Sequence, residues 1–428
     1  MQYRSTRGQA PAVSLGNALA AGLAPDGGLY VPVDLPRHSL PAGEVALPKA
    51  AQDWLAPFFA GDPLAAQLPA LCADALDLPL PRVPLGDRDE VLELFHGPTA
   101  AFKDFGARFL AACLAALRQP GEPESTILVA TSGDTGAAVA GAFHRRPGFR
   151  VVILYPDGRV SARQAHQLGA FGDNVQAFRV AGSFDDCQAM VKAAFRDEPL
   201  RQARSITSAN SISLGRLLPQ ATYYAQACAA RLAQTGERSN LIIPTGNLGN
   251  ALAALLVRAC GGPIDEVVLA TNANRVLPEL FRTHRYEGRP SVATLANAMD
   301  VGDPSNHERL AWLYPDEQLF AAGLSADSVD DAAIRQRIQQ TWQDHRYVAC
   351  PHTACALEVL ARRRADGDER AWLIAATAHP AKFETVVEPL IGGAVEPPPA
   401  LAELLARPSQ AEALAADPQA LRQVLLRR

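Results

Sequence analysis

The sequence from residue 126 onward alternates short apolar runs with segments typical of helices, and this alternation restricts the fold more than any other feature. The apolar runs are continuous, as expected for strands that are buried on both faces of a sheet. Strands are expected at residues 126–130, 149–156, 175–182, 240–244, 266–272 and 370–377. Helices are expected at residues 137–146, 162–171, 184–197 and 251–260. This order predicts an α/β fold in which parallel sheets are covered by helices.

The two ends of the chain lack this alternation. Residues 1–90 are rich in Pro, Ala and Leu and contain short helical patches such as 50–61, so we expect a separate N-terminal lobe. Residues 76–87 hold several prolines and are expected to be a linker. Residues 397–428 are expected to form helices that start at prolines and lie on the surface.

Composition excludes several classes of function. The 428 residues are 48% hydrophobic and carry a formal net charge of −5. The chain therefore has no excess of basic residues that would favour binding to nucleic acid or to a membrane surface. Seven cysteines without a CxxC pair indicate free thiols in a reducing compartment. The N-terminus lacks a signal-peptide core and no apolar run reaches about 18 residues, so we expect a cytoplasmic protein.

Two Gly-rich loops, TSGDTG (131–136) and TGNLGN (245–250), each follow an expected strand and open an expected helix. Helix N-termini bind anions, and glycine lets the backbone approach the anion closely. The alternative for each loop is a tight strand–helix turn without a ligand. Neither loop has the G-x-G-x-x-G pattern, and a Walker A lysine, HExxH and G-x-S-x-G are all absent. Dinucleotide, P-loop, zincin and α/β-hydrolase sites are therefore excluded.

Lys103 is the candidate for covalent chemistry. The chain has four lysines, and Lys103 lies between Phe102 and Phe105, where burial favours the neutral, nucleophilic amine. The alternative is an ordinary surface lysine. A reactive lysine and two anion-binding loops suit pyridoxal 5'-phosphate (PLP), an aldehyde cofactor that carries a phosphate. No carboxylate–histidine cluster has metal-ligand spacing, so we expect no metal site.

The chain resembles the threonine synthase family, in its long class with an extra N-terminal lobe, over nearly its whole length. Motifs in family order carry the resemblance, and together they are far more specific than any one of them. The matching stretches are YRSTRG (3–8), GLAPDGGLYVP (22–32), HGPTAAFKDFG (96–106), ATSGDTGAA (130–138), NSISLGRLLPQATYY (210–224), PTGNLGNALA (244–253), AMDVGDPSNHERL (298–310), PHTA (351–354) and TAHPAKF (377–383).

The resemblance implies a PLP site in which Lys103 forms a Schiff base with the cofactor and the Thr377 hydroxyl reaches the pyridine nitrogen. The residues implied to hold the cofactor phosphate through their backbone are Gly246, Asn247, Leu248, Gly249 and Asn250. The residues implied to face the substrate α-carboxylate or the cofactor ring hydroxyl are Ser132, Asp134 and Thr135. The candidates for binding the substrate phosphate are Asn210, Ser211, Arg216, Ser305 and Asn306.

The resemblance also implies the architecture of fold type II PLP enzymes, which is tryptophan-synthase β-like. We expect a small α/β domain at residues 125–215, inserted into a large PLP-binding domain at 91–124 and 216–428, with the N-terminal lobe at 1–90. The active site would lie between the small and large domains, which close on the substrate. The chain is expected to be a monomer or a homodimer.

The implied reaction is the conversion of O-phospho-L-homoserine and water to L-threonine and phosphate. Two alternatives stay open: a lyase of the same fold that eliminates phosphate and releases a 2-oxo acid, and a non-catalytic binding module. The chain departs from the family pattern at Cys350, Leu248, Ala101 and 214–215. These departures affect packing near the expected substrate-phosphate site and remove no named catalytic group.

Overall fold

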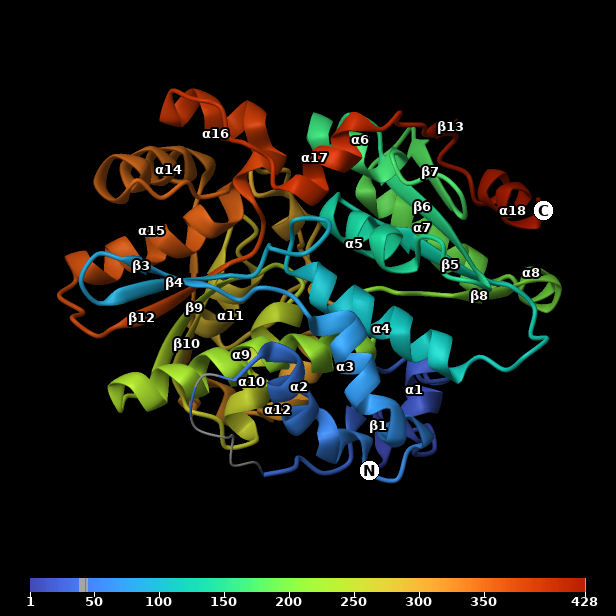
Figure 1. The fold of residues 1–428 in the computed structure, drawn as a ribbon, viewed down its shortest axis with the longest axis horizontal. Helices are drawn as coiled ribbons and strands as arrows, with labels where there is room; N and C mark the ends of the chain where they lie inside the picture. The colour runs from blue at the N-terminus through green and yellow to red at the C-terminus, as the bar shows by residue number, and fades with distance from the viewer. Residues whose placement is uncertain (38–42, 44, 428) are drawn as a thin grey trace.

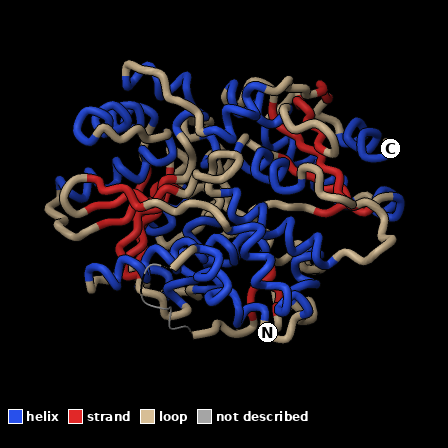
Figure 2. The backbone as a smooth tube through the Cα atoms, in the orientation of Figure 1, coloured by secondary structure: helices blue, strands red, loops and turns tan. Residues whose placement is uncertain are grey.

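The computed structural model describes residues 1–37, 43 and 45–427. In these residues two sheets of mainly parallel strands lie on opposite sides of the molecule, with helices between and around them (Figure 1). Figure 2 shows the strands of these two sheets as separate groups, and a third, small pair of strands near the N-terminus. The expected fold class, parallel sheets covered by helices with additional N-terminal structure, is confirmed.

The larger sheet has, in the described residues, six strands in the order β11-β10-β9-β12-β4-β3. Neighbouring strands are parallel except β3 and β4, which pair antiparallel at one edge. The strands are β3 (Arg82–Leu85), β4 (Asp89–Glu93), β9 (Ser239–Pro244), β10 (Ile264–Thr271), β11 (Leu324–Ser328) and β12 (Trp372–Ala376). Ile242 and Ile243 of β9 belong to hydrophobic cores on opposite faces, which explains why the central strands are continuously apolar.

Helices cover both faces of the larger sheet. The core on one face contains residues of α9 and α10, and the core on the other contains residues of α14, α15 and α16. The helices in this part of the chain are α9 (Leu214–Thr235), which precedes β9, and α10 (Gly249–Ala259), α11 (Val276–Thr283), η3 (Asn297–Met299), α12 (His307–Leu313), α13 (Gln318–Ala321), α14 (Asp331–His345), α15 (Pro351–Ala365), η4 (Pro380–Phe383) and α16 (Glu384–Ile391).

The smaller sheet has, in the described residues, five parallel strands in the order β13-β7-β6-β5-β8. One face packs on α4, α5 and α6, and the other packs on α7 and α18. The strands are β5 (Ser125–Ala130), β6 (Phe149–Pro156), β7 (Val175–Val180), β8 (Ser205–Thr207) and β13 (Glu412–Leu414). The helices are α4 (Lys103–Leu117), α5 (Asp134–Phe143), α6 (Ala162–Gly169), α7 (Phe184–Arg196), α8 (Glu198–Ala203), α17 (Pro399–Ala406) and α18 (Pro418–Leu426).

The N-terminal part is mostly helical and packs on the large body of the molecule. Its buried side chains, such as Trp54 and Leu71, share one hydrophobic core with α9 and α10. In Figure 1 these helices lie below α4, at the blue end of the colour range. The elements are β1 (Tyr3–Ser5), α1 (Leu15–Ala21), β2 (Tyr30–Pro32), α2 (Leu47–Leu55), η1 (Ala56–Phe59), η2 (Pro63–Gln67) and α3 (Leu68–Leu76).

The strands expected from apolar runs are confirmed as β5, β6, β7, β9, β10 and β12, and the expected helices as α5, α6, α7 and α10. The linker prediction for residues 76–87 is wrong at Arg82–Leu85, because these residues form the edge strand β3. Proline is compatible with an edge strand, where its missing N–H breaks no ladder bond. The C-terminal segment holds two Pro-started helices as expected, and also β13, whose three residues carry no periodic signal.

Candidate active site

A cavity of about 420 Å³ lies between the two sheets. The residues after the carboxyl ends of β5, β9 and β12 line it, together with the first residues of α4, α5 and α10. This is the edge of a parallel sheet where ligands usually bind. The residues of the expected site that line the cavity are Lys103, Ser132, Asp134, Thr135, Asn210, Ser211, Arg216, Gly246, Asn247, Leu248, Gly249, Asn250, Ser305 and Thr377.

Lys103 is the first residue of α4 and lines the cavity. The residue as a whole is partly exposed, whereas its amine end is surrounded by protein. This burial lowers the pKa of the Lys103 amine to about 8; the Asp134 charge opposes the shift, and the Lys382 and Arg216 charges add to it. A substantial fraction of the amine is therefore neutral, and able to attack a carbonyl, near pH 8.

The 131–136 loop connects β5 to α5, and two of its backbone N–H groups already have hydrogen-bond partners within the loop. The Thr131 hydroxyl accepts hydrogen bonds from the backbone N–H of Gly133 at 3.0 Å and of Gly136 at 2.8 Å. The Asp134 carboxylate accepts from Gln164 Nε2 at 2.9 Å and pairs with Lys382 Nζ at 2.7 Å. Burial would raise the pKa of Asp134, but the charges of Lys382 and Lys103 hold it well below its usual range.

The 245–250 loop connects β9 to α10 and is built for close approach. A Cβ atom on Gly246 would lie 2.7 Å from the Met299 Cα, so only glycine fits there. Leu248 is the N-cap of α10 and has φ +64°, a strained left-handed conformation for a large residue. Since a leucine side chain cannot cap a helix, the N–H groups of the first turn of α10 stay available to an anion.

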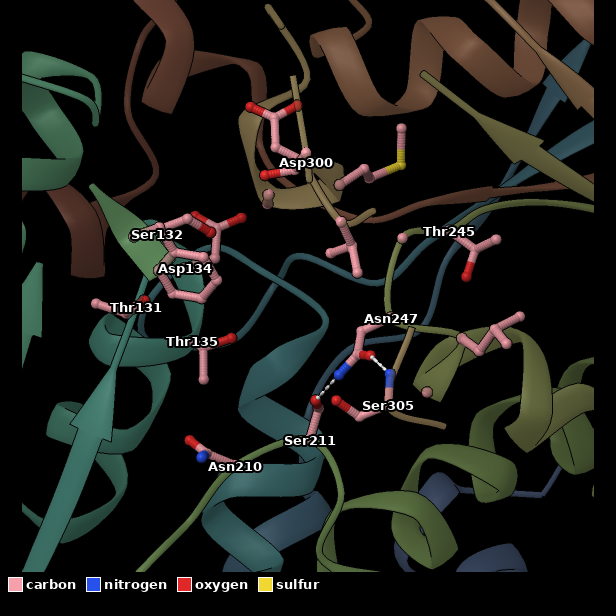
Figure 3. A pocket seen from close by; sticks show the side chains of 18 of the residues that line it. Thr131, Ser132, Asp134, Thr135, Asn210, Ser211, Thr245, Asn247, Asp300 and Ser305 are labelled. Carbon is pink, nitrogen blue, oxygen red and sulfur yellow. Dashed lines mark hydrogen bonds between the residues drawn. The ribbon is translucent and has the colours of Figure 1, made fainter. Parts of the chain in front are cut away.

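Asn247 ties three segments together at this loop. Its Nδ2 donates to Ser211 Oγ at 2.7 Å, and its Oδ1 accepts from the Ser305 backbone N–H at 2.7 Å (Figure 3). Figure 3 also shows Ser132, Asp134 and Thr135 across the cavity from Asn247. Polar groups from both sheets therefore face one space.

Asn306 does not line the cavity, unlike the other residues of the expected site. It is buried and donates to the Asn247 carbonyl oxygen at 2.9 Å, while its own Oδ1 accepts from Arg309 Nη1 at 2.9 Å. Its contacts make it a support for Asn247.

Arg216 is a buried residue of the first turn of α9 and lines the cavity. Its Nη1 donates to the Ala209 carbonyl oxygen at 2.6 Å, and its Nε has no hydrogen-bond partner among the described residues. Burial lowers the pKa of the guanidinium to about 10, with the Asp104 charge opposing the shift, so Arg216 stays positively charged at neutral pH. A buried, incompletely paired guanidinium is a strong site for an anionic group.

Thr377 directly follows β12, and its backbone carbonyl oxygen accepts from the Phe102 N–H at 2.9 Å. This bond holds Thr377 beside the residue that precedes Lys103. His352 of α15 closes the same region, and its Nε2 accepts from the Ala298 N–H at 3.1 Å. Burial lowers the pKa of His352 to about 4, although the Asp134 charge opposes it, so the ring is neutral.

Sequence reasoning missed several residues of the site. Lys382 and Gln164 contact Asp134, and Lys192 and Arg289 line the cavity as further cations. Lys382 lies in the TAHPAKF stretch and is one of only four lysines, which was a usable signal. Gln164, Lys192 and Arg289 lie in ordinary helical or loop sequence, where no pattern marks them.

The residues present fit PLP. A lysine with a lowered pKa, a helix N-terminus with available N–H groups and a glycine that admits close approach all border one cavity. Buried polar atoms near the 245–250 loop, Asn250 Nδ2 and Gln220 Oε1, also lack partners within the described residues. These features match a ligand that carries an aldehyde and a phosphate.

Family models assign the class of protein. A family model described as "Pyridoxal-phosphate dependent enzyme" matches residues 91–377, a range that includes every residue lining the cavity. A model described as "Threonine synthase N terminus" matches residues 2–76, and one described as "Threonine synthase, C-terminal" matches residues 353–425. The chain is therefore a PLP-dependent enzyme in class, and PLP is its cofactor.

Similar proteins narrow the class to one family. The chain is 38% identical to a threonine synthase of Escherichia coli (strain K12), over 97% of this chain and 96% of the relative. A crystal structure of the Escherichia coli threonine synthase superposes with a TM-score of 0.90 at 36% identity, covering 100% of this chain and 99% of that one. A PLP-bound threonine synthase from Brucella melitensis superposes with a TM-score of 0.91 at 32% identity, with the same coverage. The chain belongs to the threonine synthase family, which confirms the resemblance noted from its motifs.

Proposed function

We propose a residue-level account of the reaction of this family, the conversion of O-phospho-L-homoserine and water to L-threonine and phosphate. The observation that carries it is the meeting in one cavity of the Lys103 amine, an anion-binding helix N-terminus and the buried Arg216 guanidinium. An amino acid with a distant phosphate ester needs such an arrangement. Its amino group is handled at the cofactor, and its phosphate is held by separate donors.

In this account Lys103 binds the cofactor and then moves protons. Bound PLP supplies the electron sink that makes the substrate Cα acidic. The Lys103 amine, whose pKa burial lowers to about 8, exchanges protons at the substrate Cα and Cβ as a general base and acid. Because its pKa lies close to neutral pH, both protonation states are accessible during turnover.

The 245–250 loop is proposed to hold the cofactor phosphate through backbone N–H groups of Gly246 to Asn250. The Thr377 hydroxyl, beside the chain that leads into Lys103, is proposed to bond the pyridine nitrogen. A neutral hydroxyl there favours an unprotonated ring, which limits how much negative charge the ring accepts. The 131–136 loop is proposed to face the substrate carboxylate through Ser132 and Thr135, since the Asp134 carboxylate is occupied by Lys382 and Gln164.

The substrate phosphate is proposed to bind at Arg216, Asn210, Ser211 and Ser305. Asn306 contributes through Asn247, because it donates to the Asn247 carbonyl oxygen and does not line the cavity. Lys192 and Arg289 add positive charge along the cavity, and Arg289 is paired with Glu279. These cations attract a substrate that carries a phosphate.

We further propose that residues 125–215 move as a small domain against residues 91–124 and 216–428, with residues 1–90 as an N-terminal lobe. The cavity between the two sheets supports this division, because closure there would remove water from the reacting groups. A monomer is favoured because the large apolar side chains exposed in the described residues, Leu23, Leu232 and Val292, are few and scattered along the chain.

A cytoplasmic location without nucleic-acid partners is also proposed. Each of the seven cysteines is free and buried, as expected in a reducing compartment. The net charge of −5 disfavours nucleic acid. No helix in the described part of the chain combines the length and the apolar character that a membrane span needs.

The test is a product assay. Purified protein is incubated with PLP and O-phospho-L-homoserine, and phosphate, threonine and 2-oxobutyrate are quantified together. Equal amounts of phosphate and threonine are expected, and the Lys103→Ala variant should release neither. Phosphate with 2-oxobutyrate would instead establish the lyase alternative, and no phosphate would contradict the proposed activity.

A further inference from the structure

Lys382 is a buried cation next to the active site that the reaction account above does not use. The side chain is only 1% exposed, although it carries an amine. Its Nζ lies 2.7 Å from Asp134 Oδ1 and donates to the Thr99 carbonyl oxygen at 2.9 Å. Burying an ammonium is costly unless it is paired and hydrogen-bonded, so this arrangement needs a reason.

The pair joins three segments around Lys103. Lys382 belongs to η4, which follows the larger sheet, and Asp134 begins α5, which follows β5 of the smaller sheet. Thr99, which accepts from Lys382, precedes Lys103 by four residues, and its own N–H and hydroxyl donate to Asp104 at 2.9 and 2.6 Å. The loop before Lys103 and the helix after it are therefore fixed to the same buried ion pair.

Asp134 is held from a second side by the smaller sheet's helix α6. Gln164 Nε2 donates to the same Oδ1 at 2.9 Å, and Gln164 Oε1 accepts from Asn297 Nδ2 at 3.1 Å. Ser161 at the start of α6 donates to the Lys382 carbonyl oxygen at 2.7 Å. The Asp134 carboxylate is thus directed at Lys382, and Lys103 has no ion-pair partner among the described residues.

We propose that Lys382 is a positioning residue that keeps the Asp134 carboxylate engaged and so prevents it from forming a direct ion pair with the Lys103 amine. This inference rests on the proposed function only in giving Lys103 a role as a neutral amine. After Lys382, Lys103 is the cation whose charge acts most on the buried Asp134 carboxylate, so it would be the available partner without Lys382. The two would pair, and the Lys103 ammonium would be stabilised.

The charged and titratable groups that act on Lys103 come from each helix around it. Asp134 of α5 raises the pKa of its amine, and Lys382 of η4 and Arg216 of α9 lower it, after the larger effect of burial. His352 of α15 is neutral, because burial lowers its pKa to about 4. Among these groups, Asp134 is therefore the one whose charge favours the protonated Lys103 amine.

The experiment follows the Lys103 amine directly by NMR titration of the lysine Nζ groups in full-length, cofactor-free protein labelled with ¹⁵N-lysine. Four lysines give at most four signals, and the Lys103→Ala variant identifies the one that belongs to Lys103. Lys382→Met is compared with Asp134→Asn, with the double variant and with Lys49→Met. Lys49 forms an exposed pair with Asp53 and is the matched control.

Lys382→Met should raise the pKa of Lys103 by about 1 unit or more, and so reduce its neutral fraction at pH 7 about tenfold. Asp134→Asn should shift it in the opposite direction. The double variant should return it to within about half a unit of the wild type, because both charges are gone. Lys49→Met should leave it unchanged.

Two results would overturn the proposal: an unchanged Lys103 titration in Lys382→Met, or a double variant that stays as far shifted as the single one. Each would mean that Lys382 acts only in packing. If Lys382→Met does not fold, the Asp134→Asn and double variants still decide, because the proposal requires the former to titrate below the latter. These readouts are independent of turnover, so they separate this inference from the proposed function. In the holoenzyme, the pH profile of kcat/KM should shift in the same order.

Discussion

The 131–136 loop and the 245–250 loop are both strand–helix connections. They differ in how many backbone N–H groups they leave available to an anion. Each follows a parallel strand and opens a helix at the edge of the cavity. In the 131–136 loop, Thr131 takes two backbone N–H groups and Asp134 brings a negative charge to the helix N-terminus. In the 245–250 loop, the N-cap is Leu248, and glycine lies where the backbone of Met299 passes.

The difference shows why a Gly-rich turn alone does not define a phosphate site. A helix N-terminus attracts an anion only while its N–H groups and its partial positive charge are unused. In the 131–136 loop, Thr131 accepts from the N–H groups of Gly133 and Gly136, and the Asp134 carboxylate offsets the partial positive charge of the helix N-terminus. The 245–250 loop has used neither, and is the one suited to a phosphate.

The largest effect expected from this comparison is at Gly246. The Gly246→Val variant should lose PLP binding, because its Cβ would lie 2.7 Å from the Met299 Cα and the loop would have to move. Absorbance titration with PLP measures this. Gly393→Ala is the control, since nothing lies within 4 Å of a Cβ there. Tight PLP binding by Gly246→Val would place the cofactor phosphate elsewhere.

The next effect concerns the charge in the 131–136 loop. Asp134→Asn leaves Lys382 buried and unpaired, and should lower the free energy of unfolding by about 3 kcal/mol at pH 7. Asp53→Asn, which breaks the exposed pair with Lys49, should cost less than about 1 kcal/mol. Urea unfolding measures both, and equal losses would show that the buried pair is unimportant.

The same carboxylate predicts a pH dependence. Lys382 and Lys103 hold the pKa of Asp134 below its usual range, against the effect of burial. The stability that the ionised Asp134 carboxylate contributes to the fold is therefore present above the unfolded-state pKa of about 4. It is lost as the pH falls toward the folded-state pKa. The stability difference between wild type and Asp134→Asn should shrink on acidification below about pH 4. A difference that stays constant would contradict this assignment.

A smaller effect is expected at Asn247, which supports the 245–250 loop. Asn247→Ala removes the bonds to Ser211 and to the Ser305 N–H, and should raise KM for O-phospho-L-homoserine about tenfold. Ser211→Ala removes only one of these bonds and should have a smaller effect. Steady-state kinetics separate the two variants, and a larger effect of Ser211→Ala would mean that Ser211 itself contacts the substrate.

Much of the fold could be predicted because its strands are long and buried. The runs at β6 and β9 are continuously apolar, so they are visible without knowledge of their neighbours. β3 and β13 could not be found, because edge strands of three or four residues are stabilised by their partners rather than by their own pattern.

The residues of the site also divide into those that could be predicted from local sequence and those that could not. Lys103 and the two loops stand in marked local sequence, and the structure brings them to one cavity. The partner of Asp134 could not be predicted, because Lys382 is 248 positions further along the chain and only tertiary packing brings them together. The position of Asn306 could not be predicted for a related reason, since tertiary packing places it against the Asn247 carbonyl oxygen and outside the lining of the cavity.

The most direct test of the central claim is to find where the cofactor is attached. Borohydride reduction of the holoenzyme fixes PLP on the lysine that carries it, and peptide mass spectrometry then identifies that lysine among Lys49, Lys103, Lys192 and Lys382. The account predicts the label on Lys103 alone. A label on Lys382, or no label on any lysine, would contradict it.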